Sequence, residues 1–406
     1  MCGKAGSTEA DAGGHAWALV QLNGIWYEID STWDDFGNCL VDPSLKSSPL
    51  LSYVEEMAAD EQFSELMEHY LFLVNTGDIR SFDPQDSAVM TRTRFFAENA
   101  VKAKLTITAL GYFTPYLNGA PLTEDKLIPP KTDYNKRDLT KTQFPTFDTL
   151  SHRVYYYEYD VTPYLIPGEN VLAAHIGAGW YADAKNPAEG MPVWGENLLL
   201  FALTLTDGDG REKTVVSSED NTVWQKSYIR STSLYYGEYH DYTFYNADWN
   251  RPGFNDAGWK RPTAKEKPLT YFQKADFPAD RETDTIIPKV VSRYADRVLY
   301  DLGEVAAGWA MVRSAAPDRP NIRVILRYTD KVNEDGSFAL RHTGGAWREQ
   351  TDCYLLQRGV GEVHTEFLWH ASRYIELTGL GEIPRFIKVH TPLPQVGVFE
   401  SSNDTL

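Results

Sequence analysis

Cysteine is scarce in this sequence: its 406 residues include only Cys2, Cys39 and Cys353. An odd and sparse set argues against a disulfide framework, which small secreted domains build from pairs of cysteines. Cys353 stands next to Tyr354 in a predicted strand, and we expect it to be buried and inert. The cysteine content therefore excludes a disulfide-stapled protein and leaves the compartment open.

Long apolar runs are also missing. No run reaches the roughly 18 residues that a transmembrane helix needs, and the first residues lack the apolar segment of a signal peptide. We therefore expect no membrane partner. Because the true N-terminus is predicted below to be absent, the compartment stays unknown, with an extracytoplasmic location in a bacterium favoured.

Positive charge is in deficit. The chain has 39 Lys and Arg against 57 Asp and Glu, a net charge of −18. Such a field repels a phosphate backbone, so nucleic-acid binding is not expected. A neutral sugar is indifferent to it, and carbohydrate remains a possible partner.

Aromatic residues are plentiful: 24 Tyr, 18 Phe and 11 Trp. These side chains favour strands, and they also build surfaces on which sugars stack. Core and cross-strand packing is expected to use most of them. A length of 406 residues suggests two to four domains.

The first predicted domain, residues 1–88, contains a β-hairpin. Residues 14–22 and 25–30 read as strands around Asn23-Gly24, a strong signal for a two-residue turn. That turn places Trp17 opposite Asp30 and makes His15 the diagonal neighbour of Asp30, roughly 7–8 Å away at the backbone. A carboxylate there would orient the imidazole as a general base.

This hairpin, with Thr32-Trp33-Asp34-Asp35 after it, resembles the second half of a transglutaminase-like domain. The resemblance implies that His15 and Asp30 are the catalytic His and Asp. The alternative is a hairpin that merely carries a paired His and Asp. Residues 52–74 show helical periodicity, and a linker is expected near residues 76–90.

A nucleophile for this site is missing. In the transglutaminase-like family the cysteine opens a helix well upstream of the His. Cys2 lies only 13 residues before His15, with no helical pattern after it, and Cys39 lies beyond Asp30. We therefore expect a truncated domain without acyl-transfer chemistry. A cysteine protease or amidase using His15 and Asp30 is the alternative.

Residues 89–280 read as an antiparallel β-sandwich. Apolar and polar residues alternate in strand after strand, with an Asn-Gly hairpin signal at Asn118-Gly119 and tight turns at Pro167-Gly168 and 207–210. Five motifs resemble the N-terminal jelly-roll module of bacterial α-L-rhamnosidases, in the family's order and at roughly its spacings. They are Ala109-Leu110-Gly111-Tyr112, Tyr116-Leu117-Asn118-Gly119, Thr132-Asp133-Tyr134-Asn135-Lys136-Arg137, Tyr159-Asp160-Val161-Thr162 and Gly179-Trp180-Tyr181.

The resemblance implies a carbohydrate site, because in some rhamnosidases this jelly roll binds L-rhamnose with the help of calcium. Calcium ligands would come from Asp133, Asn135 and Asp183. Sugar would contact Asp133 and Asn135 and stack on Trp180, Tyr181 and Trp194. The alternative is that Asp133 and Asn135 only shape a turn while the tryptophans plug the sandwich.

Three carboxylates of this module, Glu196, Glu238 and Asp241, are candidates for glycoside hydrolysis by residue type alone. Nothing in the sequence sets any two of them at a predictable separation, and hydrolysis needs such a pair. We therefore expect them to be solvated or structural charges.

Residues 285–398 predict a second β-sandwich, which resembles the concanavalin-like domain of the same rhamnosidases. His370 and Arg373 alternate with apolar residues and are expected on a polar strand face. Residues 399–406 look like the family's entry into its catalytic (α/α)₆ barrel, which we expect downstream. The parent protein would hydrolyse terminal α-L-rhamnosides with inversion.

The predicted fold is therefore mainly β, with two antiparallel β-sandwich domains after a small α+β remnant. The predicted function is that of a non-catalytic N-terminal portion of an α-L-rhamnosidase, which scaffolds and holds carbohydrate such as rhamnose-containing glycans. A stand-alone lectin-like module that binds rhamnose is the alternative. Calcium is the one cofactor that the resemblance suggests.

Overall fold

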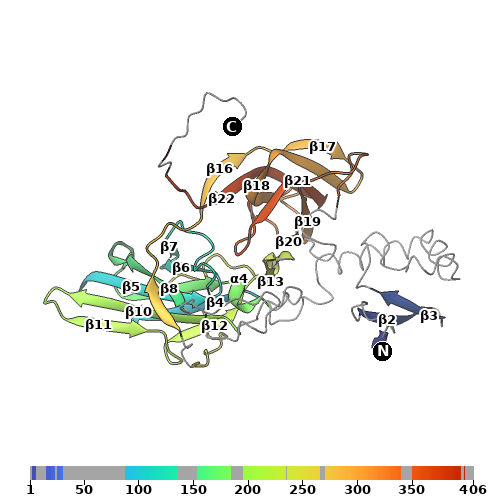
Figure 1. Cartoon of the computed structure of the whole chain (residues 1–406). Coiled ribbons are helices and arrows are strands. Elements are labelled where there is room, and N and C mark those ends of the chain that lie inside the picture. Colours follow the sequence, from blue (N-terminus) through green and yellow to red (C-terminus); the bar gives the residue numbers. More distant parts are fainter. Residues whose placement is uncertain are drawn as a thin grey trace. The chain divides into compact units, whose positions relative to one another are not determined.

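The computed structural model describes the backbone of three short strands before residue 31 and most of the chain from residue 87 on. The second part comprises residues 87–132, 134, 153–183, 195–234, 236–265, 270–339, 350–394 and 397. The chain forms two units, one of Met1–Ile79 with Leu340–Glu349 and one of Arg80–Ala339 with Gln350–Leu406 (Figure 1). In the described part of the chain, no helix is long and apolar enough to cross a membrane.

The first unit contains a three-stranded sheet in the order β1-β2-β3, formed by Cys2–Ala5, His15–Leu22 and Ile25–Asp30. Trp17 pairs with Asp30 and Leu22 with Ile25. This is the register predicted from Asn23-Gly24, and it is confirmed. The predicted helix at 52–74 lies outside the described residues.

In the second unit, two five-stranded sheets make the jelly roll. One has the order β11-β10-β5-β8-β15 and the other the order β12-β4-β9-β6-β7. The first consists of β5 (Ala100–Leu110), β8 (Arg153–Asp160), β10 (Leu198–Asp207), β11 (Glu212–Val216) and β15 (Tyr271–Lys274). The second consists of β4 (Val89–Phe96), β6 (Phe113–Leu117), β7 (Ala120–Pro121), β9 (Glu169–Ile176) and β12 (Thr222–Lys226).

The core of the jelly roll lies between these two sheets. Leu105 and Leu203 come from the first sheet, Leu117 and Ile176 come from the second, and all four belong to one buried cluster. In β10 every second residue from Phe201 to Leu205 is buried, as a strand with one covered face requires. Burial of this apolar face is what holds the sheets together.

The Asn-Gly hairpin is confirmed. Leu117 pairs with Ala120, and Asn118 and Gly119 have φ angles of 53° and 89°, as a type I′ turn requires. The Pro167-Gly168 segment instead joins β8 to β9, which lie in different sheets. It crosses the sandwich, with a short 3-10 helix, η4 (Thr162–Tyr164), on the way.

The other described strands of the second unit form a nine-stranded sheet, with the order β13-β14-β20-β19-β21-β18-β22-β16 and β17 paired to β18. Its strands are β13 (Ile229–Ser233), β14 (Gly237–Asp241), β16 (Arg281–Ile286), β17 (Lys289–Arg293), β18 (Arg297–Ser314), β19 (Ile322–Thr329), β20 (Thr351–Leu356), β21 (His370–Gly379) and β22 (Gly381–His390).

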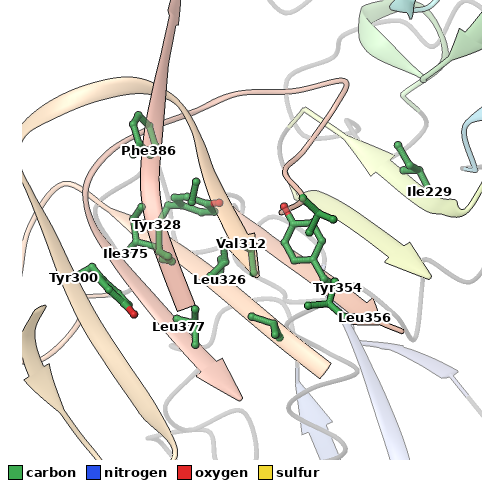
Figure 2. Packing of buried hydrophobic residues seen from close by; sticks show 14 of the residues in the cluster. Ile229, Tyr300, Val312, Leu326, Tyr328, Tyr354, Leu356, Ile375, Leu377 and Phe386 are labelled. Carbon is green, nitrogen blue, oxygen red and sulfur yellow. The ribbon is translucent and has the colours of Figure 1, made fainter. Parts of the chain in front are cut away.

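The long strand β18 turns this sheet back on itself. Its first half pairs with β17 and β21 and its second half with β22, with a register shift between Asp301 and Ala306. The fully buried side chains of Leu326, Ile375 and Phe386 fill the enclosed core (Figure 2). The described chain is therefore mainly β, as predicted, although one continuous sheet encloses this second core.

Strands β13 and β14 link the two sandwiches. They lie within the residues expected to form the jelly roll, yet β14 pairs in parallel with β20, with Tyr239 opposite Cys353. Ile229 accordingly belongs to the core of the nine-stranded sheet. Cys353 is 1% exposed, which confirms its predicted burial.

The start of β14 gives a test of this link. Gly237 has φ +99°, and a Cβ there would lie 1.9 Å from the carbonyl oxygen of Thr351. Gly237→Ala should lower the free energy of unfolding by about 2–5 kcal/mol, because backbone strain adds to the clash. Urea denaturation measures this.

Gly336→Ala is the matched control. Gly336 also has a positive φ, +80°, but nothing lies within 4 Å of a Cβ there. Its cost should be limited to about 1–2 kcal/mol of backbone strain. Equal losses for the two variants would show that β14 does not pack against β20 as closely as described.

Candidate functional site

The residues predicted to bind sugar lie partly in the described chain. Trp180 and Tyr181 belong to a one-turn helix, α4 (Gly179–Ala182). The Lys131 ammonium lies 4.2 Å from the centre of the Trp180 ring, while Tyr181 is 8% exposed and packs edge-on against Tyr134. Tyr181 is therefore a core residue, and Trp180 is the more accessible of the two rings.

Asp183 is the described member of the predicted calcium ligands. Its Oδ2 accepts hydrogen bonds from Ser233 Oγ at 3.0 Å and from the Leu234 backbone N–H at 2.9 Å. No group of three His, Cys, Asp or Glu side chains suited to a metal occurs among the described residues. Asp133, Asn135 and Trp194 lie outside those residues, so the calcium and sugar roles stay predictions.

The three candidate carboxylates have different surroundings. The Glu196 side chain is 85% exposed and lies 3.6 Å from Lys265 Nζ. Asp241 caps the 3-10 helix η5 (Tyr242–Phe244) by accepting from the Thr243 backbone N–H. Glu238 is completely buried. These are the solvated and structural positions expected for them.

The buried carboxylate of Glu238 is fully hydrogen-bonded. Its Oε2 accepts from His240 Nε2 at 2.7 Å and from the Glu366 backbone N–H at 2.8 Å. Its Oε1 accepts from the Phe367 backbone N–H at 2.9 Å and from Thr232 at 3.2 Å. A buried carboxylate persists only with such partners, so Glu238 fixes the backbone at residues 366–367.

Glu366 stands at the junction of the two sandwiches. Its Oε2 lies 3.0 Å from Nδ1 of His175, which comes from β9, and its Oε1 accepts a hydrogen bond from the Tyr228 hydroxyl. Nε2 of His175 lies 2.7 Å from Ser227 Oγ. The His175 side chain is 2% exposed, whereas the Glu366 side chain is 23% exposed.

The environment of Glu366 favours its anion. Burial alone would raise the pKa of this carboxyl. The adjacent His175 lowers the pKa through its charge and its hydrogen bond, and this effect is larger than that of burial. Together with the hydrogen bond from Tyr228, this lowers the pKa of Glu366 to about 2. Burial in turn raises the pKa of Tyr228, so its hydroxyl keeps the proton that it donates.

A cavity of about 470 Å³ opens beside this carboxylate. Tyr228, Tyr242 and Tyr245 line one part of it, and residues 357–364, which follow β20, line another. Glu366 therefore offers an anionic acceptor to a hollow with aromatic walls. Sequence reasoning missed this site, because Glu366 is a single carboxylate before an apolar run and its partners are remote in sequence.

His370 corrects one expectation. Predicted on a polar strand face, it is fully buried, with Nε2 2.8 Å from Asp352 Oδ2 and its ring stacked on Tyr328 at 3.8 Å. Tyr328 also donates to Asp352, at 2.6 Å. His370 can be buried because the Asp352 carboxylate is its hydrogen-bond partner. The alternation of polar and apolar residues in the sequence does not predict this partner. Arg373 is partly exposed and pairs with Asp301 at 2.9 Å, as a polar face allows.

The residues of the predicted transglutaminase-like site are placed by backbone register. His15 begins β2, two residues from Trp17, and Asp30 ends β3. Cys2 pairs with Ala18, three residues along β2 from His15. The catalytic roles of His15 and Asp30 stay predictions, and Cys39 lies outside the described residues.

Comparison with known families matches both sandwiches. The model described as "Alpha-L-rhamnosidase N-terminal domain" matches residues 98–284. The model described as "Bacterial alpha-L-rhamnosidase concanavalin-like domain" matches residues 292–391. Across these two domains, the chain belongs to the bacterial α-L-rhamnosidase family. The transglutaminase-like assignment of residues 1–88 stays a prediction.

Individual rhamnosidases give the same result. The chain is 31% identical over 313 residues to an α-L-rhamnosidase of Streptomyces avermitilis, covering 74% of this chain and 28% of that protein. The α-L-rhamnosidase structure from Dictyoglumus thermophilum matches with a TM-score of 0.67 and 26% identity, covering 78% of this chain and 34% of that one. The structure of the Streptomyces avermitilis enzyme complexed with L-rhamnose gives a TM-score of 0.64 and 28% identity, with coverages of 76% and 29%.

The chain thus spans about a third of the length of the rhamnosidases that it matches. The part of the chain that matches these rhamnosidases contains the jelly roll, the concanavalin-like domain and the junction at Glu366. Both domains of this rhamnosidase portion therefore contribute residues to the cavity.

Acid should weaken this junction through Glu366. Its folded-state pKa, about 2, lies below the ordinary value of 4.5, so its stabilisation is present above about pH 4.5 and is lost as the pH falls toward 2. Between neutral pH and about pH 3, the wild type should lose on the order of 2 kcal/mol more unfolding free energy than Glu366→Gln.

Urea denaturation at the two pH values measures this difference. Glu382→Gln is the control, because Glu382 is a half-exposed carboxylate paired with Arg313. That variant should keep the acid sensitivity of the wild type. If Glu366→Gln were as sensitive to acid as the wild type, the conclusion that Glu366 is ionised in the folded protein would be wrong.

Proposed function

We propose that this chain is a non-catalytic N-terminal portion of an α-L-rhamnosidase, which scaffolds the enzyme and holds carbohydrate. The observation that carries the proposal is the ordered match of two rhamnosidase domains over residues 98–391. The parent protein hydrolyses terminal α-L-rhamnosides with inversion, and its acid and base carboxylates lie in an (α/α)₆ domain expected downstream.

The environments of the described acids support a non-catalytic role. Hydrolysis with inversion needs two carboxyl groups roughly 6.5–9.5 Å apart, one of them protonated. Glu238 is enclosed by four hydrogen bonds, and the low pKa of Glu366 keeps that group ionised at the pH where a general acid must hold a proton. Neither carboxylate is suited to protonate a leaving group.

Carbohydrate is the partner of this portion, and the jelly roll is where it binds. Asp133 and Asn135 hold the sugar and, with Asp183, a calcium ion, while Trp180 and Trp194 supply faces for stacking. The similar Streptomyces avermitilis rhamnosidase has been solved in complex with L-rhamnose. L-Rhamnose is therefore the first sugar to test on this chain.

Hydrolysis of an aryl α-L-rhamnoside tests the non-catalytic role. The purified chain should release no more aryl alcohol than buffer does, because its described carboxylates include no protonated acid opposite a base. A full-length rhamnosidase serves as the positive control. Steady turnover by this chain that follows its concentration would refute the proposal.

Calorimetric titration with L-rhamnose tests the carbohydrate role. Binding heat should appear with calcium and disappear with a chelator, and Asp133→Ala should remove it, because an oxygen ligand of the metal is lost. Asp276→Ala, at an exposed position in the second unit, is the control and should bind as the wild type does. Calcium-dependent heat that Asp133→Ala leaves unchanged would place the site elsewhere.

A further inference from the structure

The cavity at the junction has the size and make-up of a ligand site. Its volume of about 470 Å³ lies within the range of small-molecule pockets, about 300–1,000 Å³. Its lining comes from two segments far apart in the sequence, residues 228–245 and residues 357–366. The described residues predicted to bind sugar or calcium, Trp180, Tyr181 and Asp183, do not line it.

The Glu366 carboxylate supplies hydrogen-bond acceptors at this cavity. A carboxylate offers about four lone-pair positions, and His175 and Tyr228 use one on each oxygen. The Glu366 side chain is 23% exposed and lines the cavity, so a ligand there can reach the acceptor positions that remain. Two oxygens of one carboxylate can receive two neighbouring hydroxyl groups at once, which is a pattern that sugars present.

The three tyrosine rings pack against one another and form a platform, a continuous aromatic surface, with no space between the rings for a ligand. The centroids of Tyr228 and Tyr245 lie 4.9 Å apart, those of Tyr228 and Tyr242 lie 5.2 Å apart, and those of Tyr242 and Tyr245 lie 5.5 Å apart. Rings this close are in contact with one another, so no cation fits between them. Tyr245 is 43% exposed, and its ring is available to the apolar face of a pyranose.

The Glu366 carboxylate favours a neutral hydroxyl donor over an anion. Glu362 pairs with Arg385 at 2.6 Å, and the Arg358 guanidinium donates to the Asp318 carbonyl at 2.9 Å. Arg358 donates to a neutral partner and keeps its positive charge, and no described lysine lines the cavity. A phosphate or a sugar acid would meet the Glu366 anion, whereas a neutral polyol would donate to it.

We propose that this cavity is a second carbohydrate site, which holds one neutral sugar unit between the Tyr245 ring and the Glu366 carboxylate. It needs no metal, and Trp180, which is assigned to the proposed calcium-dependent site, does not line it. The choice of L-rhamnose as first probe rests on the proposed function; the site itself rests on the cavity, the platform and the carboxylate.

Saturation-transfer NMR and calorimetry with L-rhamnose in the presence of a chelator test this site on the full chain. Tyr245→Ala should weaken binding at least about tenfold, since it removes the stacking face. Tyr294→Ala is the matched control, because Tyr294 is also 43% exposed but lies outside the cavity. It should bind as the wild type does.

Glu366→Gln is the second variant, and it should also weaken chelator-resistant binding at least about tenfold. Near-UV circular dichroism shows whether Glu366→Gln is folded. If it is not, the test rests on Tyr245→Ala, which should fold because the Tyr245 side chain is only partly buried. D-Glucosamine, a cationic sugar, is the second probe. Binding of D-glucosamine that depends on Tyr245, without binding of L-rhamnose, would overturn the neutral-sugar assignment.

The chelator separates the two sites. Chelator-resistant binding that Tyr245→Ala removes and Trp180→Ala spares supports the second site, whatever the fate of the first. Binding that needs calcium and Trp180 but not Tyr245 supports the proposed function and overturns the second site. Absence of any chelator-resistant binding overturns the second site as well.

Discussion

The buried Glu238 carboxylate is the interaction on which the second unit depends. It comes from β14, which lies in sequence between strands of the jelly roll, and it accepts the backbone N–H groups of Glu366 and Phe367, just before β21. A buried charge without partners would cost several kcal/mol, so this carboxylate requires the two segments to stay together. Phe367 then lies directly against Gly177 at the end of β9, where a Cβ would come within 2.3 Å of its ring.

From this contact the rest of the junction follows. Fixing residue 366 brings its carboxylate to His175 and Tyr228, and the same backbone bounds the cavity. Within β14, Glu238 donates its own backbone N–H to Asp352 at 3.1 Å, and Asp352 holds His370 and Tyr328. The polar network therefore continues from the edge of the jelly roll into the middle of the nine-stranded sheet. A site built on it acts with both domains of the rhamnosidase portion.

Local features of the fold could be predicted from the sequence. Asn23-Gly24 and Asn118-Gly119 determined two hairpins because turn geometry fixes register within a few residues. The burial of Glu238 and His370 could not be predicted, because the residue pattern shows only that they are polar. For Glu238, burial depends on partners more than 100 residues away in the sequence. The parallel pairing of β14 with β20 is likewise a long-range contact without a local signal. The candidate cavity was missed for the same reason.

Native-state hydrogen exchange tests most directly whether the two sandwiches behave as one unit around Glu238. The amides to follow are those of β9, in the jelly roll, and of β20, in the nine-stranded sheet, measured over a range of subdenaturing urea concentrations. We expect the two sets to merge into one common opening with the same free energy and the same dependence on urea. Loss of protection in β20 while β9 stays protected, with no merging at any concentration, would contradict the role given to Glu238.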